Sequence, residues 1–201
     1  MTRLLLVCGS QRRESFNARL LAHLARRLRS QCEIDDLASP DVDLPLYNQD
    51  LESEPEIVER VIRLHRRFDA SNAILVASPE YNGQLTPFLK NLIDWISRIP
   101  RIDRRFGSPF VGRPVLLCSA STGSTGGAVA IPAARALFGY VGCVVLGDAI
   151  CLPCAHQVWT GEELRPDAML EARIEAGLAR LLDHGRAFAR TQEPVNSEVA
   201  L

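Results

Sequence analysis

Residues 72–97 read NAILVASPEYNGQLTPFLKNLIDWIS, which places a strand, a turn and a helix in immediate succession. The run 72–77 is short, apolar and rich in β-formers, as is typical of a strand buried on both faces. Pro87 then opens a segment to residue 97 whose apolar residues recur at helical spacing. A buried strand that leads directly into an amphipathic helix is the repeating unit of a parallel α/β sheet.

The same unit recurs along the rest of the chain. Three further segments have the composition of buried strands, 3–8, 113–119 and 142–147, and the alternating pattern of 32–37 predicts one more strand. Four further segments have helical patterns: 16–28, 55–68, 126–139 and 166–190. We expect the acidic 32–37 strand near a sheet edge, and a bend or a delayed start in the helix that holds Pro132. Five strands alternating with helices predict an α/β, doubly wound, five-stranded parallel sheet with helices on both faces.

The length and charge of the chain limit what it can be. Its 201 residues suit one domain, expected over 1–190, followed by a disordered tail at 191–201. A formal net charge of -1 gives no overall field that favours nucleic acid or an anionic membrane. No apolar run approaches the roughly 18 residues of a membrane span, so we expect a cytoplasmic protein. The six cysteines lie mostly inside apolar runs, which disfavours a disulfide framework.

Ligands of doubly wound sheets bind at the carboxyl ends of the strands, where the strand order reverses. The loop after the first strand reads GSQRRESFN (9–17) and enters a helix. Ser10, Arg12, Ser15 and Asn17 offer several kinds of donor to one phosphate, beside the free N–H groups of the helix start. The alternative is an ordinary turn with Ser15 as the helix N-cap. A dinucleotide glycine fingerprint and a Walker lysine are both absent from this loop, which favours a mononucleotide.

Two more loops reach the same edge of the predicted sheet. The loop 78–83 reads SPEYNG, and its Pro and Asn-Gly steps present backbone groups at fixed angles, suited to the edge of a flat heterocycle. The loop 119–127 reads SASTGSTGG, whose small side chains let a ligand approach the backbone closely. A plain tight turn and a flexible surface connection are the respective alternatives.

Taken together, GSQRRESFN, SPEYNGQLTPFLKNLIDWISR and ASTGSTGG resemble the NAD(P)H-dependent FMN reductase family, which has a flavodoxin-like fold and includes quinone, azo-dye and chromate reductases. The resemblance covers roughly residues 3–150. It implies that the first motif holds the phosphate of FMN through Ser10, Arg12, Ser15, Phe16 and Asn17. It also implies that the isoalloxazine ring is lined by the other two loops: Pro79, Glu80, Tyr81, Asn82, Gly83, Ser119, Ser121, Thr122 and Gly123.

The resemblance further implies an activity. NADPH or NADH would deliver hydride to the flavin and be replaced by a small acceptor, such as a quinone, an azo compound, a metal oxyanion or free flavin. Because the flavin does the difficult chemistry, no side chain is nominated as catalytic. The resemblance also implies a homodimer or homotetramer, with the helix of Trp95 as a candidate interface. The alternative function is a flavin-binding electron carrier or regulatory protein, which the near-neutral charge disfavours.

One segment lies outside the resemblance. Residues 151–156 read CLPCAH, a Cys-x-x-Cys pair with a histidine nearby. Cys151, Cys154 and His156 could ligate zinc or form a redox pair, but a four-ligand site needs one more ligand and Pro153 equally suits a loop turn. We therefore assign no metal. His23, His65 and His184 fall within helical patterns and are interpreted as surface or packing residues.

Overall fold

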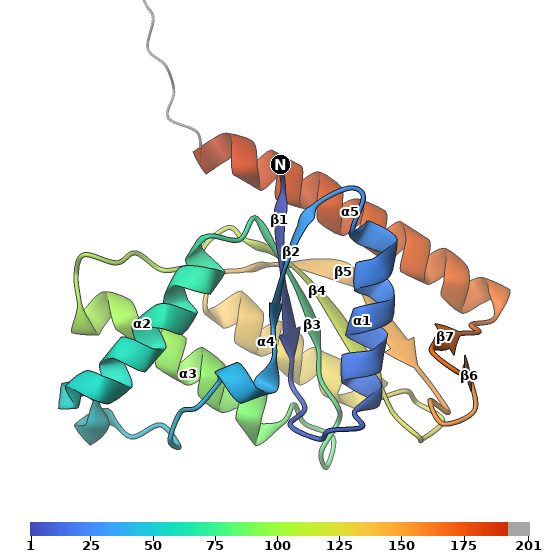
Figure 1. The fold of residues 1–201 in the computed structure, drawn as a ribbon, viewed down its shortest axis with the longest axis horizontal. Helices are drawn as coiled ribbons and strands as arrows, with labels where there is room; N and C mark the ends of the chain where they lie inside the picture. The colour runs from blue at the N-terminus through green and yellow to red at the C-terminus, as the bar shows by residue number, and fades with distance from the viewer. Residues whose placement is uncertain (193–201) are drawn as a thin grey trace, which may run out of the picture.

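A five-stranded parallel sheet in the order β2-β1-β3-β4-β5 forms the centre of the protein (Figure 1). The computed structural model describes residues 1–192. The strands are β1 (Arg3–Cys8), β2 (Glu33–Leu37), β3 (Ala73–Ala77), β4 (Pro114–Ala120) and β5 (Val144–Leu152). All four neighbouring pairs are parallel, and β2 lies at an edge as its acidic residues predict. The predicted doubly wound sheet is confirmed.

Helices cover both faces of this sheet. α1 (Phe16–Leu28) and α5 (Ala168–Gln192) pack on one face, whereas α2 (Pro55–Asp69), α3 (Pro87–Ile102) and α4 (Ile131–Tyr140) pack on the other (Figure 1). Three short 3-10 helices, η1 (Ser39–Asp41), η2 (Gln49–Ser53) and η3 (Ala128–Ala130), lie in the connections. No helix within residues 1–192 is both long and apolar enough to cross a membrane.

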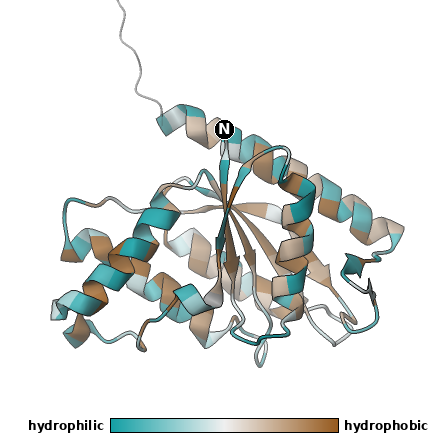
Figure 2. Ribbon diagram, viewed as in Figure 1, coloured by the Kyte–Doolittle hydropathy of each residue, from teal (hydrophilic) through white to brown (hydrophobic). Residues whose placement is uncertain are grey.

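The alternation of strand side chains produces two separate cores. Leu4 and Leu6 of β1 face α1 and α5, whereas Leu5 and Val7 face α2 and α3. β3 is buried along its whole length, because helices cover both of its faces. Apolar colour accordingly concentrates on the strands and on the inner sides of the helices (Figure 2).

β5, the last strand of the five-stranded sheet, is longer than predicted. The sequence prediction ended it at residue 147, but β5 continues to Leu152. Its register moves from Val145 opposite Val115 to Ala149 opposite Leu117, so that a bulge absorbs the intervening residues. The Gly147-Asp148 pair has the composition of a turn. Because the bulge absorbs these residues, β5 pairs with β4 again from Ala149 onward.

Two helix boundaries also differ from their predictions. α3 was expected to end at residue 97 but includes Pro100 in its last turn and ends at Ile102. Arg98 donates to Glu52 at 2.5 Å, and Ile99 is buried, so tertiary contacts hold this turn despite the proline. Pro132 lies in the first turn of α4, where a missing N–H costs nothing, so it delays the helix and does not bend it.

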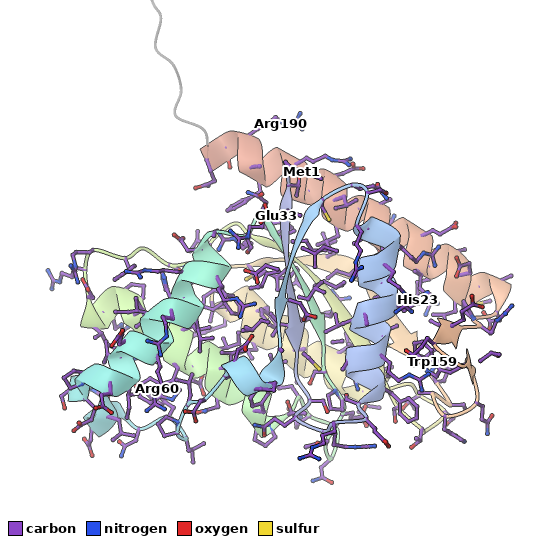
Figure 3. The ribbon with its side chains drawn as sticks, viewed as in Figure 1. Met1, His23, Glu33, Arg60, Trp159 and Arg190 are labelled. Atoms are coloured by element: carbon purple, nitrogen blue, oxygen red, sulfur yellow. The ribbon has the colours of Figure 1, made fainter. Side chains whose placement is uncertain are left out.

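A small hairpin was missed altogether. β6 (Trp159–Thr160) and β7 (Glu163–Leu164) pair in antiparallel fashion beside α1. The Arg19 guanidinium lies 4.3 Å from the centroid of the Trp159 ring and donates to the Gly161 carbonyl at 2.6 Å. His23 meets the same ring edge-on at 6.1 Å between centroids (Figure 3). The hairpin therefore packs on α1 through the contact of Trp159 with Arg19 and His23.

The C-terminal prediction is only partly covered by the structure. Thr191 and Gln192 belong to α5. The rest of the segment predicted as a disordered tail, residues 193–201, lies outside the described residues. The expected single domain over residues 1–190 stays a prediction.

Candidate functional site

The loops after β1, β3 and β4 meet at the carboxyl edge of the sheet, which is the lower edge in Figure 1. Between them lies a cavity of about 130 Å³, here called the three-loop cavity. It is lined by Ser10, Arg12, Ser15, Phe16, Asn17, Pro79, Glu80, Tyr81, Ala120, Ser121 and Thr122. Ten of the fourteen predicted site residues are in this set, and Ala120 is an addition.

The first loop is shaped by close packing and by a helix cap. A Cβ atom at Gly9 would lie 2.6 Å from Ser78 Oγ, so only glycine lets this loop pass the second one. Ser15 is the N-cap of α1, and its Oγ accepts from the N–H groups of Asn17 and Ala18 at 3.2 and 3.3 Å. A hydroxyl that accepts still has its own proton to donate. The cap interpretation and the anion-binding interpretation of Ser15 are therefore compatible.

Asn17 ties the first loop to the third. Its Nδ2 donates to the Ala120 carbonyl at 2.9 Å, and its Oδ1 accepts from the Ala120 N–H at 2.9 Å. The residue is only 2% exposed, so neither bond is replaced by bulk water. One N–H of the amide is not used by these bonds. Asn17 consequently acts first as a brace between two walls of the cavity.

The second loop forms a tight two-residue turn. Tyr81 and Gln84 exchange backbone hydrogen bonds at 2.9 and 3.0 Å, with Asn82 and Gly83 between them at φ of 52° and 73°. This matches the positive φ expected of the Asn-Gly step. It also puts both residues at the tip of the turn and outside the cavity lining, whereas Tyr81 lies at the rim and is 47% exposed.

The contact of Thr86 with the first loop was not predicted from the sequence. Its buried hydroxyl donates to the Gly9 carbonyl at 2.7 Å and accepts from the Leu89 N–H at 3.2 Å. It thus joins the first loop to the N-terminus of α3. A threonine directly before Pro87 is an N-cap signal that could have indicated part of this role.

The third loop rests on the end of β5. Ser121 N–H donates to the Leu152 carbonyl at 3.1 Å, and Ala155 N–H donates to the Ser121 carbonyl at 2.9 Å. Cys154 N–H donates to the Gly123 carbonyl at 3.1 Å. The segment 152–155 therefore supports this wall from behind, a role that nothing local in its sequence indicates.

Two predicted residues of the third loop lie outside the cavity. Ser119 is 1% exposed, and its Oγ has no hydrogen-bond partner among residues 1–192. A Cβ at Gly127 would lie 2.0 Å from that Oγ. The loop can therefore pass this close to Ser119 only because residue 127 is a glycine. Gly123 is likewise absent from the lining, and it contributes through the carbonyl bonded by Cys154.

The three-loop cavity is lined by one cationic side chain, Arg12, and one acidic side chain, Glu80. Arg12 donates to the Glu14 carbonyl at 3.3 Å and forms no ion pair within residues 1–192. Glu80 lines the same cavity but accepts from the Ala130 N–H at 3.2 Å, which orients its carboxylate toward η3. Hydroxyls of Ser10 and Ser15, the start of α1 and an unpaired guanidinium form a donor set suited to a phosphate monoester.

The Cys-x-x-Cys segment has no metal-site geometry. No group of three metal-ligating side chains occurs among the residues that the structure describes. Cys151 and Cys154 are free, and burial is the main reason that the pKa of the Cys151 thiol is raised. A raised pKa keeps this thiol protonated at neutral pH and therefore poorly nucleophilic.

Fold and site together define the class of this protein: a doubly wound α/β protein whose ligand cavity lies where the strand order reverses. The chain belongs to the NADPH-dependent FMN reductase family, whose family model matches residues 2–157. The predicted resemblance is confirmed. Family membership agrees with the expected FMN cofactor.

Two relatives and one solved structure illustrate what this chain is similar to. A quinone reductase of Escherichia coli K12 is 34% identical over 120 residues, which are 60% of this chain and 60% of the relative. A 2-hydroxy-1,4-benzoquinone reductase of Burkholderia sp. is 33% identical over 144 residues, 71% of this chain and 73% of that protein. The NAD(P)H:(acceptor) oxidoreductase FerB of Paracoccus denitrificans has a TM-score of 0.77 at 24% identity, covering 94% of this chain and 99% of that one. The last likeness shows the fold alone.

We predict that Asn17→Asp destabilises the protein by about 2–4 kcal/mol. The substitution removes the donor to Ala120 and buries a carboxylate against a carbonyl oxygen. Urea unfolding followed by circular dichroism measures the change. Asn82→Asp, at the exposed turn tip, is the matched control and should stay within about 0.5 kcal/mol of the wild type. Equal stability of the two variants would show that the Asn17 brace contributes nothing.

Proposed function

We propose that this protein is an FMN-dependent NAD(P)H oxidoreductase that reduces small acceptors, such as quinones, azo compounds, metal oxyanions or free flavin. The observation that carries the proposal is the convergence of three loops on one cavity that combines phosphate donors with backbone-lined walls. The match to the E. coli quinone reductase spans about 60% of that protein's length. A quinone acceptor for this chain is therefore part of the proposal.

We assign the FMN phosphate to the first loop and the isoalloxazine ring to the other two. Ser10, Arg12, Ser15 and the start of α1 would hold the phosphate, with Phe16 and Asn17 shaping this end of the cavity. Pro79, Glu80, Tyr81, Ser121 and Thr122 would flank the ring. Asn82, Gly83, Ser119 and Gly123 would act through loop shape, because they lie outside the lining.

When bound, FMN supplies the capacity to accept a hydride and to pass electrons on. The protein's own residues bind and orient it. Gly9, Thr86 and Asn17 hold the three loops against one another, which would lower the ordering cost of binding. No side chain of the cavity is needed as a nucleophile or as an obligatory base.

Arg12→Ala should weaken FMN binding at least tenfold, since a charge-assisted bond is worth about 1.5–3 kcal/mol. Fluorescence titration of the apoprotein with FMN measures the dissociation constant. Arg13→Ala is the matched control, because it removes a neighbouring guanidinium that does not line the three-loop cavity. If both variants bind FMN as tightly as the wild type, the phosphate assignment is wrong.

Anaerobic mixing with NADPH or NADH should bleach the flavin absorbance, and a quinone added afterwards should restore it. Stopped-flow absorbance measures both half-reactions separately. The alternative, an electron carrier or flavin-binding regulatory protein, predicts flavin that binds but is not reduced by either nucleotide. The near-neutral net charge of -1 offers no strongly acidic docking face to support that alternative.

We also propose that the protein forms a homodimer or homotetramer. Trp95 itself lies inside the protomer, where its Nε1 donates to the Pro45 carbonyl at 2.9 Å, so an interface at α3 would use its exposed neighbours. Tyr81 and Val129 are exposed apolar side chains, and Val129 lies beside Gly83 at the rim of the site. Sedimentation velocity should show two or four chains per particle, and a single monomer peak would refute the proposal.

We place the protein in the cytoplasm, without a nucleic-acid or membrane partner. Its cysteines at 8, 32, 118, 143, 151 and 154 are all free, which suits a reducing compartment. Recovery in the membrane fraction after cell fractionation would contradict this placement.

A further inference from the structure

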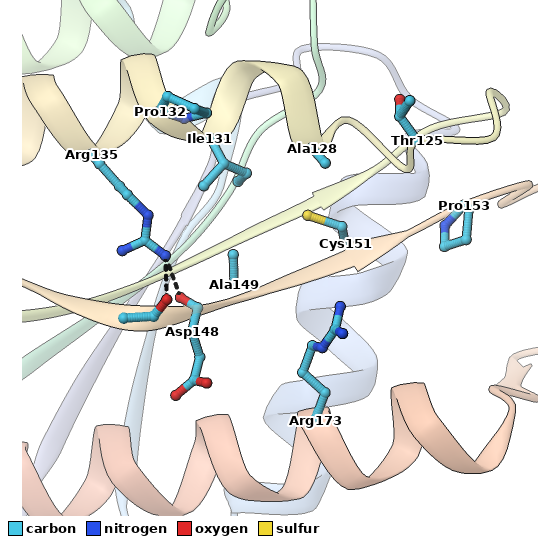
Figure 4. Close-up of a pocket in the computed structure, with 11 residues that line it drawn as sticks. Thr125, Ala128, Ile131, Pro132, Arg135, Asp148, Ala149, Cys151, Pro153 and Arg173 are labelled. Carbon is cyan, nitrogen blue, oxygen red and sulfur yellow. Dashed lines mark hydrogen bonds between the residues drawn. The ribbon is translucent and has the colours of Figure 1, made fainter.

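A second cavity runs along the free edge of β5, between α4 and α5 (Figure 4). It has a volume of about 550 Å³, and we call it the edge cavity. Its lining comprises Thr125, Ala128, Ile131, Pro132, Arg135, Gly147, Asp148, Ala149, Cys151, Pro153 and Arg173. None of these residues lines the three-loop cavity.

The edge cavity carries uncompensated positive charge. Arg135 reaches over the bulge of β5 and donates to the backbone carbonyls of residues 146–148, so no carboxylate neutralises it (Figure 4). Asp148 is paired instead with Arg180 at 2.6 Å. Arg173 enters from α5 on the other side and forms no ion pair within residues 1–192. Two guanidinium groups from two helices therefore face one space that lacks a free counter-charge.

The rest of the lining is small and largely apolar. Ala128, Ile131 and Pro132 of η3 and α4 form one wall, and Ala149 and Pro153 lie on the β5 side. Such a surface accepts a flat ring system, and a guanidinium can stack on that ring or bind a phosphate in bidentate fashion. The combination fits an aromatic group that carries a phosphate monoester, as in an adenosine phosphate.

The edge cavity lies next to the three-loop cavity along the chain. Thr122 lines the three-loop cavity and Thr125 lines the edge cavity. Three residues of extended chain span at most about 11 Å, so the two linings come within that distance of each other. The intervening backbone contains Gly123, and Gly126 and Gly127 follow at φ of 62° and 82°. A dinucleotide with one end over the three-loop cavity would cross this glycine-rich segment, where the absence of side chains lets its pyrophosphate lie close to the backbone.

We propose that the edge cavity binds the adenosine 2′-phosphate end of NADPH, with Arg173 and Arg135 as the residues that select NADPH over NADH. This inference rests on the proposed function, because it assumes that the nicotinamide end reaches flavin at the three-loop cavity. The 2′-phosphate is a dianion near neutral pH, whereas NADH carries a neutral hydroxyl at the same position. A site whose guanidinium groups have no carboxylate partner therefore gains a charge-assisted contact with NADPH alone.

The test is a steady-state comparison of both donors on the FMN-loaded protein. Arg173→Ala should raise the KM for NADPH roughly fivefold, as expected for a charge-assisted contact of an exposed guanidinium, and should leave the KM for NADH and both kcat values unchanged. Arg173→Glu should raise the KM for NADPH further. In the wild type, 2′,5′-ADP should inhibit competitively against NADPH, more strongly than 5′-AMP does, and Arg173→Ala should abolish that difference.

Arg186→Ala is the matched control, because it removes another guanidinium of α5 that does not line the edge cavity. It should leave both KM values unchanged. Arg135→Lys, which keeps the charge but loses the fork geometry, tests the second guanidinium without leaving the β5 carbonyls wholly unpartnered.

The inference is overturned if Arg173→Ala changes the two KM values equally or not at all, or if the wild type shows no preference for NADPH. Those outcomes leave the proposed function intact as long as either nucleotide reduces the flavin. Failure of both nucleotides to reduce bound FMN in the wild type would instead refute the proposed function itself.

Discussion

The two hydrogen bonds between the Asn17 side chain and the Ala120 backbone connect parts of the chain that are 103 residues apart. Parallel strands bring the loops after β1, β3 and β4 to one edge, but that alone would leave each loop free to move independently. Asn17 joins the first loop to the third, and Thr86 joins the first to the second through the Gly9 carbonyl. The three-loop cavity depends on these two bridges, because they are buried and have no competing water.

The distribution of charge separates structural arginines from those available to ligands. Arg67 lies between Asp35 and Asp41, and Arg98 is paired with Glu52 at 2.5 Å. Arg12 and Arg173, in contrast, have no carboxylate partner within residues 1–192, and each lines a cavity. A chain of almost zero net charge thus keeps unpaired positive charge on both sides of its glycine-rich third loop. That arrangement suits ligands that carry phosphate at more than one position.

Much of the three-loop cavity could be predicted, and the exceptions have local physical reasons. Ser10, Arg12 and Ser15 follow a recognisable strand and precede a recognisable helix, so their place at the carboxyl edge follows from the topology. Asn82 and Gly83 were expected to face the ligand, but the backbone pairing of Tyr81 with Gln84 puts them at the tip of a turn. Ala120 was missed because it contributes through its backbone, which carries no signal in side-chain chemistry.

The sequence by itself determined the fold class, the order of strands and helices, and the kinds of donor at each loop, because periodicity and turn chemistry are properties of neighbouring residues. Only the tertiary structure decided what distant residues do to one another. The bulge that extends β5, the docking of Trp159 on Arg19 and the edge cavity between Arg135 and Arg173 all arise from packing between separate elements. Register and packing depend on both partners at once, and no local pattern in either partner records them.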